Sequence, residues 1–155
     1  MSVPLLVRGR LSLDALLAEV MSHECGGTAV FLGTVRNGPE EKAAPGDGVT
    51  GIEYSAYDAM AERELGTILT EVHERWPGAR AAARHRLGLV PVGDASIAIV
   101  VAAPHRRHAF EACRYVIEAV KRRLPIWKKE YHPDGTTTWV DADGRPAESG
   151  PAPAR

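Results

Sequence analysis

The sequence has 155 residues, which is enough for one domain with a hydrophobic core. Lysine and arginine number 19, and aspartate and glutamate number 20, so the formal net charge is -1. This balance argues against a general nucleic-acid-binding protein, which usually carries a basic excess. The chain has no apolar run of about 18 residues and no apolar leader before a cleavage site, so we expect a cytoplasmic protein without a membrane span.

The first half of the chain alternates helix and strand patterns. Ser12 can cap a helix whose leucines recur at helical spacing, and Asp58 can cap a second helix that ends at "WPG". Between them lies a loop without periodicity that holds three glycines and two prolines. The predicted elements are a strand over 5–7, a helix over 12–20, a strand over 28–36, a loop over 37–48, a strand over 49–57 and a helix over 58–76.

The second half contains the clearest helix, with apolar residues at steps of three and four between 110 and 124. Two strand-like runs about Pro133-Asp134-Gly135 indicate a hairpin. The predicted elements are a strand over 79–88, a turn over 89–94, a strand over 95–103, a helix over 105–124 and a hairpin over 126–140. The mixture predicts an α+β fold, with one domain over 1–142 and a disordered tail over 143–155.

The two cysteines, Cys25 and Cys113, are too few for a disulfide framework or a thiolate metal site. Cys113 falls on the apolar stripe of the long helix, where a thiol is usually inert. His105 and His108 have the spacing of metal ligands, but no third ligand is apparent, so that alternative is weak. We predict neither a metal nor a cofactor.

Five cations lie in the segment 121–130, "KRRLPIWKKE", around an apolar run. At about 100° per residue, Lys121 lies roughly 60° from the centre of the helix's apolar stripe, at the border of the buried face. Partial burial beside Arg122 and Arg123 would lower the pKa of Lys121, as a proton carrier or amine nucleophile requires. The alternative is a lysine whose stem only covers apolar surface.

The strand after Pro125 carries the remaining cations of this segment. The period of two places Lys128 on one face between Ile126 and Glu130, and Lys129 on the other face. The neighbours of Lys128 can hold its ammonium group in a fixed place. The alternative is a sheet edge that uses lysines to prevent aggregation.

Two further segments can bind an anion. His105 and Arg106 stand at the start of the long helix, where free backbone N–H groups favour a phosphate or carboxylate. Arg36 ends a buried strand beside the loop over 37–48, and a guanidinium can grip a phosphate with two hydrogen bonds. The alternative for both segments is an ordinary surface charge.

These segments, in this order, resemble the MoaE family, the large catalytic subunits of molybdopterin synthase. The resemblance covers about residues 28–140 through "FLGTVRN", "IEYSAYDAMAERE", "RHRLGLVPVGDASIAIVVAAPHRRHAFEACRYVIEAVKRRLPIWKKE" and "DGTTTWV". It implies an α/β hammerhead-type fold with an antiparallel sheet and packed helices. It also implies a sulfurtransferase of molybdenum cofactor biosynthesis, which converts cyclic pyranopterin monophosphate into the molybdopterin dithiolene. The sulfur would come from a thiocarboxylate on the C-terminal Gly-Gly of a small ubiquitin-like subunit.

The resemblance also implies roles for particular residues. The catalytic lysines of the family fall on Lys121 and Lys128. The substrate-contact positions fall on Thr34, Val35, Arg36, His105, Arg106, Lys121, Lys128, Lys129 and Glu130. Lys121 would act as acid, base or transient covalent amine, while Lys128 would stabilise developing negative charge. A sulfur supplied by the partner explains why no nucleophilic cysteine is apparent.

The family forms a homodimer that carries one small subunit at each end, a heterotetramer. About 24 Å of helix separates His105 from Lys121, so one pterin cannot touch both ends of a straight helix. We therefore predict that two chains share each site. Two alternatives stay open at this point: a non-catalytic scaffold that binds a ubiquitin-like protein, and a small RNA- or nucleotide-binding module.

Overall fold

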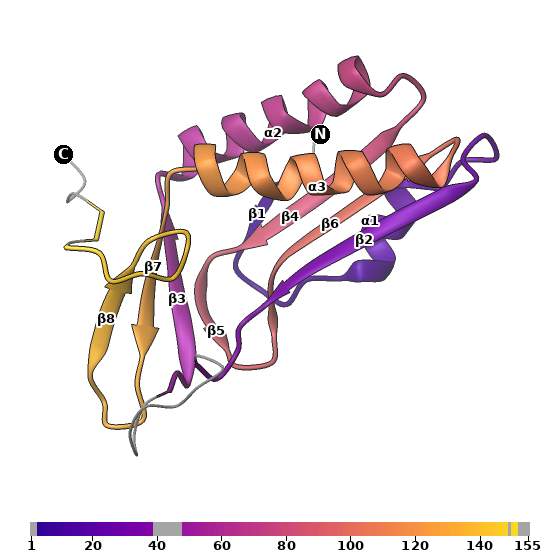
Figure 1. Ribbon diagram of the computed structural model, residues 1–155. Helices are drawn as coiled ribbons and strands as arrows, with labels where there is room; N and C mark the ends of the chain where they lie inside the picture. Colours follow the sequence, from indigo (N-terminus) through magenta and orange to yellow (C-terminus); the bar gives the residue numbers. More distant parts are fainter. Residues whose placement is uncertain (1–2, 39–47, 149, 152–155) are drawn as a thin grey trace.

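The computed structural model describes residues 3–38, 48–148 and 150–151 (Figure 1). The predicted loop over 37–48 therefore lies mostly outside the described residues. The elements in chain order are β1 (Leu6–Val7), α1 (Leu13–Val20), β2 (Gly27–Thr34), β3 (Gly51–Ala56), α2 (Asp58–Arg75), β4 (Arg80–Arg86), β5 (Gly88–Pro91), β6 (Ala95–Ala103), α3 (Arg106–Arg123), β7 (Ile126–Tyr131) and β8 (Thr137–Val140).

The first sheet has the strand order β1-β4-β6-β2, with β1 parallel to β4 and the other pairs antiparallel. Helices α2 and α3 cover one face and α1 covers the other (Figure 1). Ile97 and Ile99 of β6 pack toward α2 and α3, whereas Ala98 and Val100 pack toward α1. Because β6 is covered on both faces, its sequence is apolar without interruption.

The second sheet has the strand order β5-β3-β7-β8 and is antiparallel throughout. The predicted hairpin forms β7 and β8, and Gly135 turns the chain with a φ of +87°. One face of this sheet packs against the end of the first sheet through a small cluster that includes Val35, Ile52 and Leu87. The α+β class and antiparallel sheets predicted from the sequence are confirmed.

Two local predictions were wrong. Tyr57, not Asp58, occupies the N-cap position of α2, and the Asp58 carboxylate instead accepts a hydrogen bond of 3.0 Å from Arg8. The segment over 89–94 was predicted as a turn, but its first half belongs to β5, which pairs with β3. Gly88, with a φ of +87°, redirects the chain from the first sheet to the second, and Val90 is fully buried there.

The start of the predicted tail is folded back on β8. The backbone N–H groups of Asp143 and Arg145 donate to the Asp141 carboxylate, each at 2.9 Å. Ala147 N–H donates to Trp139 O at 2.8 Å. The domain boundary near residue 142 stays a prediction, but residues 141–147 make an ordered turn, which the sequence analysis did not expect.

Candidate active site

The end of β2, the last turn of α3, β7 and the turn at 141–144 surround one concave region. It consists of an inner cavity of about 160 Å³ and an adjoining outer hollow of about 620 Å³. Thr34, Lys121 and Lys128 line both spaces. Six of the predicted site residues line the outer hollow: Thr34, Val35, Arg36, Lys121, Lys128 and Glu130.

Lys128 is half-buried at the junction of the two spaces. Its strand pairs with Tyr54 of β3 on one side and with Val140 of β8 on the other, so its backbone is fixed in mid-sheet. Burial lowers the pKa of Lys128, and the positive charge of Lys121 lowers it further, against an opposing effect of Glu130. Lys128 can therefore exchange a proton more readily than an ordinary surface lysine.

Lys121 is exposed, and its ammonium donates a hydrogen bond of 3.3 Å to the backbone oxygen of Ala142. The prediction that Lys121 is partly buried is therefore wrong for the single chain. Its position at the border of the apolar stripe is correct, because the neighbouring Val120 is buried. The border opens into the hollow, which the turn at 141–144 also lines.

Two of the three other cations of the segment 121–130, Arg123 and Lys129, are engaged elsewhere. Arg123 binds the carboxylates of Glu64 and Glu71 on α2, at 2.6 and 2.7 Å. Lys129 lies on the opposite face of β7 from Lys128, 3.3 Å from the Glu53 carboxylate and over the rings of two aromatic residues. Only Lys121 and Lys128 of this cluster line the concave region among the described residues.

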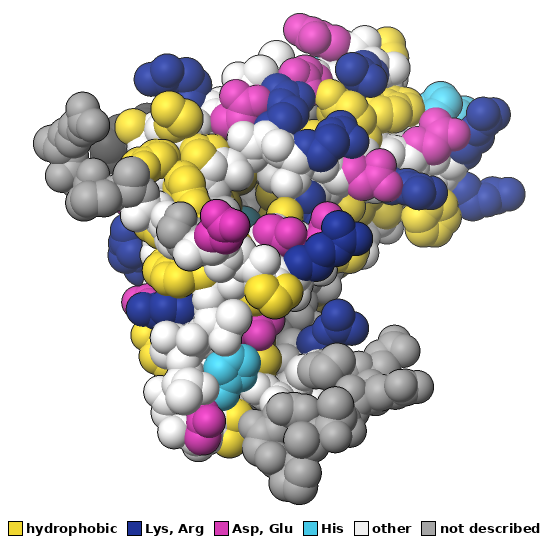
Figure 2. Space-filling model, turned by 60° about the vertical axis from the view of Figure 1, so that its left-hand side comes forward, with side chains coloured by type: hydrophobic (Ala, Val, Ile, Leu, Met, Phe, Trp, Pro, Cys, Tyr) yellow, Lys and Arg dark blue, Asp and Glu magenta, His cyan; other side chains and the backbone are white. Residues whose placement is uncertain are grey.

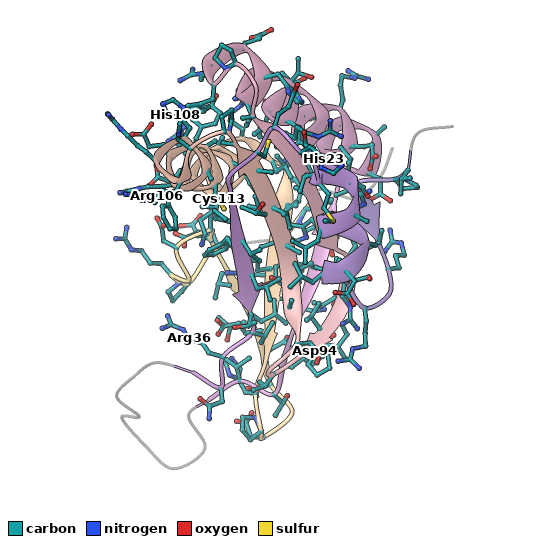
Figure 3. The ribbon with its side chains drawn as sticks, turned by 90° about the vertical axis from the view of Figure 1, so that its right-hand side faces the viewer. His23, Arg36, Asp94, Arg106, His108 and Cys113 are labelled. Atoms are coloured by element: carbon teal, nitrogen blue, oxygen red, sulfur yellow. The ribbon has the colours of Figure 1, made fainter. Side chains whose placement is uncertain are left out.

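His105 and Arg106 stand at the other end of α3 from Lys121. Both are exposed and line a separate shallow hollow with Pro104 and Arg107. The 18 residues of α3 run without a break (Figure 1), so the helix is not bent to bring its ends together. Arg106 lies at the end of α3 that faces the viewer in Figure 3, and Arg36 lies well apart from it. A single chain therefore does not assemble all the predicted residues.

The inner cavity also has a polar floor, formed by Tyr54, His85 and Ser96, which was not predicted from the sequence. The His85 ring is buried and packs edge-on against the Tyr54 ring at 5.2 Å. Burial lowers the pKa of His85 to about 4, so this ring is neutral near pH 7. Its Nδ1 lies 2.9 Å from the Arg86 carbonyl, which only accepts, so Nδ1 carries the proton and Nε2 is an acceptor.

No signal of a nucleophilic thiol or of a metal site is present in the described residues. Cys113 is buried in the main core, and burial raises the pKa of its thiol to about 11. No group of three or more potential metal ligands occurs in the described part of the chain. No helix described here is both long and apolar enough to cross a membrane. The titratable side chains that line the two spaces are Arg36, Tyr54, His85, Lys121, Lys128, Glu130 and Asp143.

The family of this chain follows from comparison with known proteins. A model described as MoaE protein matches residues 6–123. The chain belongs to the MoaE family. The family match includes Arg36, His105, Arg106 and Lys121, while Lys128, Lys129 and Glu130 lie just beyond its end.

The names of similar proteins agree with this assignment to the MoaE family. It is 42% identical over 130 residues to the molybdopterin synthase catalytic subunit of Bos taurus, which covers 84% of this chain. The match spans 66% of the bovine protein, just under two thirds of its length. A crystal structure of molybdopterin synthase from Staphylococcus aureus has a TM-score of 0.80 and 33% identity, and covers 90% of this chain and 97% of its own.

A more distant structure shares the fold. It is a complex of subunits 1 and 2 of molybdopterin-converting factor from Helicobacter pylori, with a TM-score of 0.71 at 22% identity. The superposition covers 92% of this chain and 93% of the other. At this identity the likeness supports the fold alone.

Proposed function

We propose that this chain is the catalytic subunit of a molybdopterin synthase, a sulfurtransferase that builds the dithiolene of molybdopterin from cyclic pyranopterin monophosphate. The observation that supports the proposal is that one hollow is lined by three cations from different elements: Lys121 of α3, Lys128 of β7 and Arg36, which follows β2. A phosphorylated substrate needs fixed cations, and proton transfer needs a lysine with a lowered pKa. This hollow offers both in a member of the MoaE family.

Within this proposal, the two lysines exchange the tasks that the family resemblance implied. Lys128 has a lowered pKa and a fixed backbone, so it exchanges the proton when the thiocarboxylate sulfur forms a C–S bond to the pterin side chain and a C–O bond of that side chain breaks. Water then cleaves the acyl–sulfur bond, which leaves the sulfur on the pterin and the partner as a carboxylate. Lys121 is exposed and lines the same hollow, where its ammonium group stabilises negative charge as the reaction proceeds. Arg36 holds the phosphate at the outer edge of the hollow.

The sulfur donor in this proposal is a small ubiquitin-like protein whose C-terminal Gly-Gly carries the thiocarboxylate. The inner cavity leads from Lys128 to apolar residues such as Ile117 and Ile126. A narrow, partly apolar space suits a chain end without side chains. The polar floor supplies the acceptors that a peptide backbone requires when it leaves water. We place the reaction in the cytoplasm.

We further propose that two copies of the chain share each site. β2 is an edge strand, and its exposed residues Val30, Phe31 and Leu32 form an apolar stripe that is unusual for an edge facing water. Gly27, at the start of β2, lies against Arg106, whereas Thr34, at its end, lies beside Lys121. A two-fold axis at the middle of β2 would therefore bring His105 and Arg106 of a second copy toward Lys121.

The two alternative functions are less well supported. On the face drawn in Figure 2, basic and acidic side chains alternate and do not form one continuous basic surface, as an RNA-binding module would need. A non-catalytic scaffold does not require a lysine whose pKa is lowered by burial at the centre of a polar hollow.

Reconstitution tests the proposed function. The purified chain is mixed with a thiocarboxylated small subunit and cyclic pyranopterin monophosphate, and molybdopterin is measured. We expect product with the intact partner and none with a partner that lacks its two C-terminal glycines. Tight binding of the partner without any product would instead favour the scaffold. Binding of single-stranded RNA with a steep salt dependence would favour the RNA-binding module.

A further inference from the structure

The chain leaves the first sheet immediately before Arg36. The register between β2 and β6 shifts between Gly33 and Thr34, and Val35 then pairs with the turn before β6. Val35 N–H donates to Asp94 O at 3.0 Å, and Gly93 N–H donates to Val35 O at 2.7 Å. The Val35 side chain is 2% exposed. Both the backbone and the side chain of Val35 are thus fixed, one residue before Arg36.

The turn that holds Val35 is itself held by an ion pair. Asp94 N–H donates to Pro91 O at 3.1 Å, which closes the turn. The Asp94 carboxylate accepts a hydrogen bond of 3.1 Å from Nη1 of Arg86, at the end of β4. The side chains of Arg86 and Asp94 are only 12% and 27% exposed, so solvent does not readily replace either partner.

Arg86 is poorly satisfied for a purely structural residue. Its Nε is the one fully buried side-chain nitrogen or oxygen without a hydrogen-bond partner among the described residues. A buried guanidinium with an unpaired donor costs stability, and an apolar residue of similar size would avoid that cost. A requirement other than stability would explain why an arginine stands at this position.

We infer that Arg86 and Asp94 are positioning residues for Arg36. The ion pair fixes the turn over 91–94, the turn fixes Val35, and Val35 sets the point from which the Arg36 side chain enters the outer hollow. The inference rests on the proposed function in one respect, since it takes Arg36 as the residue that binds the substrate phosphate. The Arg36 side chain is exposed, so a fixed backbone helps to aim it for a two-point grip on phosphate.

The chain offers a matched control for this inference. Arg84 lies on the same strand as Arg86, its side chain is 10% exposed, and it pairs with Glu19 of α1. That pair lies on the α1 side of the first sheet and has no link to Val35. Arg84→Met and Arg86→Met therefore remove the same charge from the same strand, and only the second releases the turn that holds Val35.

Steady-state kinetics with the thiocarboxylated partner test the positioning. We expect Arg86→Met to raise KM for cyclic pyranopterin monophosphate about tenfold with little change in kcat, and Arg84→Met to leave KM unchanged. Asp94→Asn should act in the same direction as Arg86→Met, with a smaller effect. In an Arg36→Ala background, Arg86→Met should have no further effect on KM. Equal effects of Arg84→Met and Arg86→Met, or additive effects with Arg36→Ala, would overturn the inference.

Hydrogen exchange of the Val35 amide gives a second readout that does not depend on turnover. Arg86→Met should accelerate exchange at Val35 at least several-fold relative to wild type, and Arg84→Met should not. If the exchange rate of the Val35 amide is the same in Arg86→Met as in wild type, the inference is overturned, whatever the kinetics show. If instead Arg36→Ala leaves KM unchanged, the phosphate-binding role of Arg36 fails, while the exchange result still decides whether Arg86 fixes Val35.

Discussion

Lys121 and Lys128 come from different elements, α3 and β7, and face the same hollow, where burial lowers the pKa of Lys128 and the charge of Lys121 lowers it further. Pro125 produces this arrangement, because it ends α3 and begins the turn into β7. The Pro125 carbonyl accepts a hydrogen bond of 3.3 Å from Tyr57 N–H, which ties the turn to the start of α2. The two lysines are therefore close but not equivalent: one is exposed and the other is half-buried.

Substitution of either lysine should stop most of the turnover. We expect Lys121→Ala to abolish product formation with the fold intact, because an exposed lysine contributes little packing. Lys128→Ala should lower kcat by roughly 10²- to 10⁴-fold, as is typical when a positioned acid or base is removed. The control is Arg122→Ala, which removes an exposed cation beside Lys121. Near-normal turnover of both lysine variants would refute the catalytic assignment.

The coupling between the lysines predicts a measurable change in titration. A neighbouring positive charge disfavours the protonated form of Lys128, so Lys121→Gln should raise the pKa of Lys128. NMR of isotopically labelled lysine measures the change directly. In wild type the pKa of Lys128 should lie below the usual lysine value. An unaltered pKa in Lys121→Gln would mean that the two ammonium groups do not approach each other in solution.

His85 should make the fold less stable in mild acid. Its pKa is about 4 in the folded chain against 6.5 as the ordinary value, so between these two pH values the unfolded chain binds the extra proton. The stabilising effect is complete above pH 6.5 and is lost as the pH falls toward 4. The loss from this one residue is on the order of 2 kcal/mol at pH 5.

Urea unfolding of wild type and His85→Gln at pH 7 and pH 5 isolates this contribution, because all other titrating groups are common to both chains. The stability of His85→Gln should fall less between the two pH values than that of wild type. An identical fall in both proteins would show that His85 titrates normally and is not buried as described.

Sharing of the site between two copies can be tested by subunit mixing. Lys121→Ala is one inactive variant, and His105→Ala combined with Arg106→Ala is the other. After chain exchange, half of the dimers are mixed and each mixed dimer has one site without a substitution, so about a quarter of all sites should recover activity. If exchange is proven and no activity returns, His105 and Arg106 do not act at the Lys121 of a second copy.

Local sequence patterns predicted most of the helices and strands. The predictions failed where a residue's environment depends on contacts between distant parts of the chain. The spacing of apolar residues located α3, and the period of two correctly separated Lys128 from Lys129. The exposure of Lys121 could not be predicted from its angle on the helix alone, because the neighbouring surface is a hollow and not a packed sheet. The strand β5 was missed because its burial comes from pairing with β3, about 35 residues earlier in the chain.

The polar floor of the inner cavity shows a similar limit. Tyr54, His85 and Ser96 belong to three strands of two sheets, and no spacing in the sequence relates them. The motif that contains His85 contributed to the family resemblance, but nothing in the sequence indicated that the ring lies beside Lys128. The role of Arg86 was equally hidden, since it depends on an ion pair with Asp94 and on the backbone partners of Val35.

The most direct test of the proposed chemistry is the ratio of sulfur consumed to molybdopterin formed in a single turnover. The purified chain is mixed with cyclic pyranopterin monophosphate and excess small subunit whose C-terminal thiocarboxylate carries labelled sulfur. A dithiolene contains two sulfur atoms, so the account predicts that two thiocarboxylates are converted to carboxylates for each molybdopterin, with all label in the product. Product that contains unlabelled sulfur, or thiocarboxylate consumed without labelled product, would contradict sulfur transfer from the partner at this site.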